Sequence, residues 1–287
     1  MRLKVPLAAL AALCLVATAK SKAEPFFAPA LAEREATSVE NVVVFGDETR
    51  QTLDAYARRN RLDPRQLEQL HAGSGIVRCG NARGAAQLTL VDDVITSAAH
   101  VFFDESGGIR ARKGACEFVI ESRGEEIVTR IDPGSIVAGS EFPYASAPAN
   151  DWAVARLERP VGGTVPYALG APRRGAAVQF VARGHIDWGG GRRMSIEDCR
   201  LRDVLDEGVE GAREFSFDCA AGVGASGGAL LDASGSNLLA IFVGYHSSTP
   251  EARQAFSATN YNFAVTIEGA FRRAVLQAAG LRTATAE

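Results

Sequence analysis

One stretch of the chain, residues 219–232, combines a single hydroxyl with the backbone freedom that an acyl-transfer site needs. Four glycines and four alanines surround Ser226 there. Because glycine allows tight turns and close approach of a ligand, Gly224 and Gly227 would leave Ser226 at a sharp turn with its hydroxyl uncovered. The N–H groups of Gly224 and Ser226 would then face one point, as the stabilisation of an oxyanion requires. Taken alone, the stretch is equally typical of a glycine-rich turn between strands.

A serine hydroxyl needs a neighbouring base, and the base must be held in one tautomer by a third group. His71, His185 and His246 lie in a polar helix end or in loops rich in glycine or serine. His100 differs because it ends the strand-like run 94–99, behind small residues. An imidazole in that position would be held rigidly and would still be accessible to a substrate. An isolated histidine of this kind is nevertheless more often structural than catalytic.

The third group has one clear candidate, Asp151. It leads into the apolar run 152–157, so its carboxylate is expected to be partly desolvated and to need a hydrogen-bond donor. An imidazole N–H would serve as that donor. The alternative interpretation is that Asn150 and Asp151 only form a turn before a strand.

The three blocks together are more specific than any one of them. Thr96-Ser-Ala-Ala-His100, Asp151-Trp-Ala-Val and Gly224-Ala-Ser-Gly-Gly228 resemble, in order, the sequence blocks of the trypsin-like (chymotrypsin-fold) serine peptidases, over residues 75–270. The resemblance implies two six-stranded antiparallel β-barrels with the site in the cleft between them. It implies that His100 takes the proton of Ser226, that Asp151 orients the ring, and that the N–H groups of Gly224 and Ser226 form the oxyanion hole.

Several positions depart from the digestive enzymes of that family. Ala225 stands where those enzymes carry an aspartate that pairs with a newly cut N-terminus, so that activation switch is not expected in this chain. Other features look more like the bacterial glutamyl endopeptidases, yet Phe242 stands at their substrate-reading histidine, so a preference for glutamate is not expected. Ala220 replaces the trypsin-type aspartate. Ala220, Ala221 and Phe242 therefore predict a pocket for a small or apolar side chain.

The elements around these residues read as short strands separated by Gly, Pro, Asp and Asn. This spacing favours an all-β sandwich or pair of barrels. Two short helices are expected within 49–71, and an amphipathic helix is expected at 267–279. The expected strands are 76–79, 85–90, 94–97, 116–122, 126–131, 152–157, 177–181, 194–200, 214–217, 228–231, 238–243 and 261–265.

The N-terminus reads as a secretory signal. A short basic start precedes the apolar run 5–19, with small residues at Ala17 and Ala19. We expect cleavage after Ala19, or else after Ala23, and the run is too short to span a membrane. The expected domain plan is a signal peptide at 1–19, a leader or propeptide-like helical segment at 20–72, a first barrel at 73–160, and a second barrel with the C-terminal helix at 161–287.

Removal of the signal would leave four cysteines. An even number in an oxidising compartment suggests two disulfides, for which three pairings are possible. Sequence proximity favours Cys79–Cys116 and Cys199–Cys219. The chain has no C-x-x-C motif and no clustered His/Cys set, so neither a metal nor another cofactor is expected.

The net charge of −3, without blocks of like charge, argues against a nucleic-acid partner or an anionic membrane surface. The sequence predicts a secreted or periplasmic serine endopeptidase that acts on a protein or peptide substrate. A catalytically silent binding module on the same fold is the first alternative. A serine esterase is the second, because Gly224-x-Ser-x-Gly228 also matches a nucleophile elbow, although too little chain follows Ser226 to supply that fold's acid and histidine.

Overall fold

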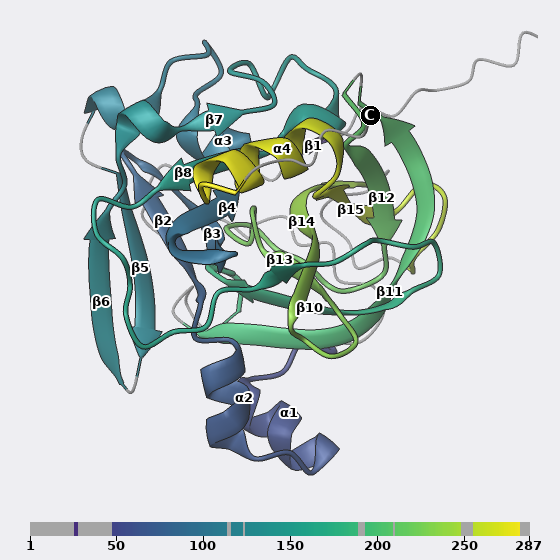
Figure 1. Ribbon diagram of the computed structural model, residues 1–287. Coiled ribbons are helices and arrows are strands. Elements are labelled where there is room, and N and C mark those ends of the chain that lie inside the picture. The colour runs from purple at the N-terminus through teal and green to yellow at the C-terminus, as the bar shows by residue number, and fades with distance from the viewer. Residues whose placement is uncertain are drawn as a thin grey trace, which may run out of the picture.

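The computed structural model describes residues 26–27, 48–113, 116–122, 124–188, 193–208, 210–247 and 255–281. The expected signal peptide and the β-branched run 42–45 lie outside the described residues. The described chain forms two β-barrels, with a helical pair beneath them and a helix lying across the front (Figure 1).

The first barrel is an antiparallel sheet with the strand order β6-β5-β2-β3-β4-β8-β7. A bridge between Ile131 and Leu157, next to the ends of β6 and β8, joins the two edges of its first six strands. The two-residue β7 is added outside β8. The bounds are β2 (Ser74–Cys79), β3 (Ala82–Thr89), β4 (Val91–Ser97), β5 (Cys116–Ser122), β6 (Glu125–Arg130), β7 (Val137–Ala138) and β8 (Ala153–Arg156).

The second barrel is closed, because β14 pairs with β13 on one side and with β15 on the other. Its six strands are β10 (Ala177–Arg183), β11 (Met194–Glu207), β12 (Arg213–Phe217), β13 (Ala229–Asp232), β14 (Asn237–His246) and β15 (Tyr261–Thr266). Two short strands are added to β14, namely β9 (Ala168–Leu169) in parallel and β1 (Phe26–Phe27) in antiparallel orientation. The predicted all-β, chymotrypsin-like double-barrel fold is thereby confirmed.

Each of the twelve expected strands is present, and β11 continues beyond its expected end at residue 200 to Glu207. The two-residue strands β1, β7 and β9 were not expected. The expectation that His100 ends a strand is wrong in detail. Strand β4 stops at Ser97, and His100 lies in the one-turn helix α3 (Ala99–Phe102). The chain leaves the ladder there because the backbone N–H of His100 donates to the Asp151 carboxylate.

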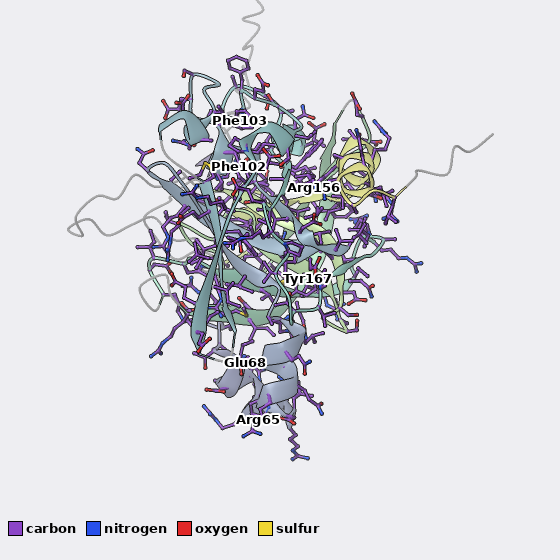
Figure 2. The ribbon with its side chains drawn as sticks, turned by 60° about the vertical axis from the view of Figure 1, so that its left-hand side comes forward. Arg65, Glu68, Phe102, Phe103, Arg156 and Tyr167 are labelled. Carbon is purple, nitrogen blue, oxygen red and sulfur yellow. A yellow bond between two sulfur atoms is a disulfide. The ribbon has the colours of Figure 1, made fainter. Side chains whose placement is uncertain are left out.

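The two expected N-terminal helices are α1 (Leu53–Asn60), capped by Thr52, and α2 (Pro64–Leu70), capped by Asp63. They pack on the second barrel, where the hydroxyl of Tyr56 donates to Asp198 of β11. In Figure 2, Arg65 of α2 lies at the end of the helical pair that is farther from the barrels, and Glu68 lies nearer to them.

The C-terminal helix α4 (Gly269–Ala278) returns to the first barrel, because Phe271 stacks on Trp152 with 4.8 Å between ring centroids. Three short 3-10 helices complete the described structure: η1 (Arg110–Lys113), η2 (Pro133–Ser135) and η3 (Pro148–Asn150). None of the helices in the described ranges is long and apolar enough to cross a membrane.

The structure forms the two disulfides that sequence proximity favoured. Cys79 and Cys116 lie opposite each other in the β2–β5 ladder, and Cys199 of β11 is bonded to Cys219, seven residues before Ser226. The second bond therefore attaches the serine-bearing stretch to the longest strand of the second barrel.

Removing the second disulfide with the double change Cys199→Ala and Cys219→Ala is expected to lower the free energy of unfolding by about 3 kcal/mol, because a loop of this length is no longer closed in the unfolded chain. The bonded cysteines are 20 residues apart. Urea unfolding of the oxidised proteins measures the loss. An unchanged unfolding free energy would show that this bond contributes nothing to stability.

Candidate active site

The imidazole of His100 and the carboxylate of Asp151 form a buried pair. Nδ1 of His100 lies 2.6 Å from Oδ2 of Asp151, and the backbone N–H of His100 donates to Oδ1 over 2.9 Å. Both side chains are fully buried. Because a carboxylate only accepts, the ring proton is assigned to Nδ1, which leaves Nε2 as the basic nitrogen. This is the tautomer that can take a proton from a hydroxyl.

Two short helical turns place this pair. His100 lies in α3, directly after β4, while Asp151 follows η3 and precedes β8. Since β4 and β8 are antiparallel neighbours and Ser97 pairs with Ala153, the turn after the end of β4 and the turn before the start of β8 lie side by side at one end of the sheet. Sheet register therefore brings together two residues that are 51 positions apart in the chain.

Ser226 lies in a turn that only glycine permits at its flanks. Gly224 and Gly227 have φ angles of +87° and +88°, in the region that side chains rarely adopt. The N–H of Gly227 donates to the carbonyl of Phe242, and the N–H of Phe242 donates to the carbonyl of Gly228. The turn is therefore fixed to β14, and its predicted sharp geometry is present. The expectation that the Ser226 hydroxyl is uncovered is wrong, because Ser226 is fully buried between the barrels.

The first barrel contacts this turn directly beside His100. A Cβ on Gly227 would lie 2.2 Å from the carbonyl oxygen of Ala85 and 3.0 Å from the backbone nitrogen of Ala98. A Cβ on Gly84 would lie 2.8 Å from the carbonyl oxygen of Ser226 and 2.4 Å from Val101. The backbone at Ser226 thus packs against residues on both sides of His100 in the chain. The structure brings the serine turn and the His–Asp pair to one place between the barrels.

The expected oxyanion donor at Gly224 has a defined orientation. The carbonyl of Val223 accepts from the N–H of Ile186 over 3.0 Å. The Val223 carbonyl and the Gly224 N–H belong to one trans peptide unit and therefore point in opposite directions. The N–H of Gly224 is consequently turned away from Ile186.

The three residues expected to line the specificity pocket are all buried, but they lie in two different environments. The backbone N–H of Ala220 donates to Oε2 of Glu197 over 2.9 Å. The ring of Phe242 packs edge-on against Phe180 and Phe217, with centroids 5.7 and 5.9 Å away, in the barrel core that also contains Ala221. Phe242 thus contributes to the packing beneath the serine turn.

Glu197, which sequence reasoning missed, stands directly behind Ala220. Burial raises its pKa to about 7, although hydrogen bonds from Thr49 and Ala220 and the charge of Arg50 act in the opposite direction. Nothing in the alternating pattern of β11 distinguishes this glutamate. Its burial depends on the segment before α1, which packs on β11 and places Thr49 against the Glu197 carboxylate.

Replacing Glu197 by Gln is expected to stabilise the protein only at higher pH. A carboxyl whose pKa rises from 4.5 to about 7 on folding binds more protons in the folded state, so its contribution to stability falls as the pH rises between those values. Glu197→Gln keeps an acceptor for Ala220 and removes the buried charge. The free energy of unfolding should rise by up to about 3 kcal/mol at pH 8 and stay unchanged at pH 4. Urea unfolding at both pH values measures the difference, with the exposed Glu126→Gln as control; a gain of equal size at pH 4 would show that the buried charge is not the cause.

No protein-family model and no curated protein matches the sequence. The fold does match solved structures. A Glu endopeptidase structure superposes with a TM-score of 0.59 at 14% identity, covering 83% of this chain and 100% of that one. A thermostable serine protease, AL20, from an extremophilic microorganism superposes with a TM-score of 0.53 at 16% identity, covering 75% of this chain and 99% of that one. The chain therefore has the double-barrel fold of chymotrypsin-like serine proteases.

Proposed function

We propose that this protein is a secreted or periplasmic serine endopeptidase. The observation that carries the proposal is the buried His100–Asp151 pair, held in the base-competent tautomer and packed beside the Ser226 turn. Fold alone does not imply catalysis, because unrelated functions share common folds. The combination of a nucleophile, a base and an orienting carboxylate at one barrel interface is specific to acyl transfer.

In this mechanism the Ser226 hydroxyl attacks the carbonyl carbon of the scissile peptide while Nε2 of His100 takes its proton. Asp151 holds the ring through Nδ1 and stabilises the imidazolium that forms. The negative oxygen of the tetrahedral intermediate accepts from the N–H groups of Gly224 and Ser226. The imidazolium then protonates the leaving amine, which leaves an acyl-enzyme that water hydrolyses with His100 again acting as base.

A peptide substrate would bind along β14. The segment β1 pairs with this strand in antiparallel orientation, with Phe26 opposite Tyr245 and Phe27 opposite Gly244. Two residues before Gly244, the backbone of Phe242 is bonded to the serine turn. An extended chain added to this edge therefore runs toward Ser226, which is the β-addition mode of peptide recognition. The uncharged Ala220 favours a small or apolar residue at the cleaved position.

Because β1 occupies the edge proposed for the substrate, weakening it is expected to improve substrate binding. The double change Phe26→Pro and Phe27→Pro removes the one N–H that donates to β14, because successive N–H groups of a strand point to opposite sides. KM for a peptide substrate should fall about tenfold, since an intramolecular competitor acts at a high effective concentration. Initial rates of the full chain measure this effect. The double change to Ala retains the N–H groups and serves as control; an unchanged KM in the proline variant would show that β1 does not compete with substrate.

The experiment that tests the function is incubation of the folded protein with a peptide library, followed by mass spectrometry of the products. We expect cleavage on the carboxyl side of small or apolar residues, lost in His100→Ala. The full burial of Ser226 favours one alternative, a catalytically silent binding module. Peptides that bind but are never cleaved would support that alternative.

A further inference from the structure

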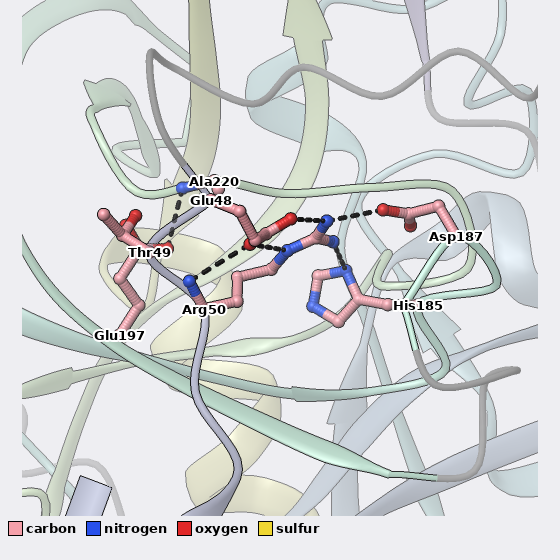
Figure 3. A network of polar contacts seen from close by, with 7 residues as sticks. All are labelled: Glu48, Thr49, Arg50, His185, Asp187, Glu197 and Ala220. Carbon is pink, nitrogen blue, oxygen red and sulfur yellow. Dashed lines mark hydrogen bonds and ion pairs between the residues drawn. The ribbon is translucent and has the colours of Figure 1, made fainter. Parts of the chain in front are cut away.

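A buried arginine before α1 lies close to the backbone that precedes the expected oxyanion donor. Arg50 has a side chain only 2% exposed. Its Nε and Nη2 atoms donate to the two carboxylate oxygens of Glu48 over 2.8 and 2.7 Å, and Nη2 also donates to Asp187 over 2.6 Å. Figure 3 shows the guanidinium between these two carboxylates, with His185 beneath it.

The surroundings of Arg50 fix its charge and the state of His185. Burial alone would lower the pKa of Arg50, but hydrogen bonds and charge interactions with Glu48 and Asp187 raise it overall. Nη1 of Arg50 lies 3.0 Å from Nδ1 of His185. Burial, together with Arg50, lowers the pKa of His185 well below its usual value, so the ring is neutral. Because a guanidinium only donates, Nδ1 of His185 is the acceptor and the ring proton lies on Nε2.

The Arg50–Asp187 pair packs on the backbone just before the expected oxyanion donor. A Cβ on Gly222 would lie 2.1 Å from Oδ1 of Asp187 and 3.2 Å from Nη1 of Arg50. The neighbouring Ile186 holds the Val223 carbonyl, and that bond sets the direction of the next N–H. The position of residues 186–187 is therefore coupled to the orientation of the Val223–Gly224 peptide.

The residues on either side of Arg50 also interact with the chain near Ala220. The hydroxyl of Thr49 donates to Glu197, whose second oxygen accepts the N–H of Ala220. Gln51 exchanges two backbone hydrogen bonds with Ile196 of β11, at 3.1 and 2.9 Å. Residues 48–51, which we call the clasp, thus reach the backbone of residues 220–222 in two ways, through Glu197 at Ala220 and through the Arg50–Asp187 pair at Gly222.

We propose that Arg50 is a positioning residue for the oxyanion donor, acting through Asp187, Ile186 and Val223 on the N–H of Gly224. The inference rests on the proposed peptidase function. Ala225, the residue just before the nucleophile, is fully buried and carries no charge that could hold the turn from within. The backbone at Gly222, just before the turn, packs instead against an ion pair that the clasp supplies from a distant part of the chain. This identifies residues 48–51 as part of the working enzyme.

A selective effect on kcat distinguishes positioning from general stabilisation. Arg50→Ala is expected to lower kcat about 100-fold, the size of effect seen when one oxyanion donor is lost, and to leave KM within about twofold. The matched control is Arg213→Ala. Arg213 forms the same forked contact with Glu268, at 2.8 and 2.8 Å, where β12 begins beside the start of α4. Its removal should leave kcat unchanged.

Chemical rescue provides a readout that a purely structural role would not produce. Ethylguanidinium at millimolar concentration should restore at least tenfold in kcat to Arg50→Ala and should have no effect on Arg213→Ala. If Arg50→Ala does not fold, Arg50→Lys decides. It keeps the positive charge but cannot make the fork, so kcat should still fall at least tenfold.

The outcomes separate this inference from the function on which it rests. A wild-type protein that hydrolyses peptides, together with an unchanged kcat in Arg50→Ala or in Arg50→Lys, would overturn the positioning role alone. An equal loss in Arg213→Ala, or a loss confined to KM, would also overturn it. A folded wild-type protein that hydrolyses no peptide would remove the proposed function and this inference together.

Discussion

Ser226→Ala is expected to lower kcat for peptide hydrolysis by about 10⁶-fold and to leave the fold intact. Only the hydroxyl oxygen is lost, from a turn whose backbone is fixed by Gly227, Gly228 and Phe242. Without that oxygen no acyl-enzyme can form, and what activity remains comes from substrate binding and the oxyanion donors. Hydrolysis of a fluorogenic peptide and the thermal unfolding midpoint measure the two parts of this prediction.

Ser216→Ala is the matched control for the serine change. Ser216 is also buried in the second barrel, where its hydroxyl contacts the backbone of Asp203. Its replacement should leave kcat unchanged and lower stability slightly, because the two hydrogen bonds between its hydroxyl and the Asp203 backbone are lost. Activity that survives in Ser226→Ala would mean that another residue is the nucleophile.

Asp151→Asn is expected to lower kcat about 10⁴-fold near neutral pH. The carboxylate accepts from both the backbone N–H and Nδ1 of His100. An asparagine side chain can accept through only one atom and presents an N–H₂ group with the other. If its oxygen keeps the backbone bond, the amide donates to Nδ1 and moves the ring proton to Nε2, where the base must be free to accept.

The control for this change is Asp132→Asn. Asp132 lies in the first barrel and caps η2 by accepting the N–H of Gly134, away from the His–Asp pair. The Asp132→Asn variant should show a small decrease in the free energy of unfolding and an unchanged kcat. Steady-state rates across a pH series measure both variants. An Asp151→Asn protein with wild-type kcat would show that His100 does not depend on this carboxylate for its tautomer.

The sequence was sufficient to predict the barrels, and it also pointed to the three candidate site residues, because these features leave local signals. The alternation in 152–157 and the glycines around Ser226 are set by neighbours in the chain. The strand that ends before His100 was also predictable, but the one-turn helix α3 was not. That turn depends on a hydrogen bond from His100 to Asp151, which no local pattern encodes.

The clasp was not predictable for the same physical reason. Arg50 is an ordinary polar residue in a polar stretch, and its partner Asp187 is 137 positions away. Charged residues are usually exposed, so local sequence gives no reason to bury this one. Its burial follows only from the packing of α1 on β11. The pocket residue Phe242 shows the converse: its position in the chain suggested a pocket, while its ring packs against Phe180 and Phe217.

The most direct measurement of the central claim is covalent labelling of the folded protein by a fluorophosphonate, read by intact mass and peptide mapping. The full chain and the Phe26→Pro, Phe27→Pro variant are labelled in parallel, so that competition by β1 is tested together with reactivity. We predict a single adduct on Ser226, absent in Ser226→Ala and greatly slowed in His100→Ala. Folded protein that remains unlabelled in both forms, or an adduct on another residue, would contradict the assignment of Ser226 as the activated nucleophile.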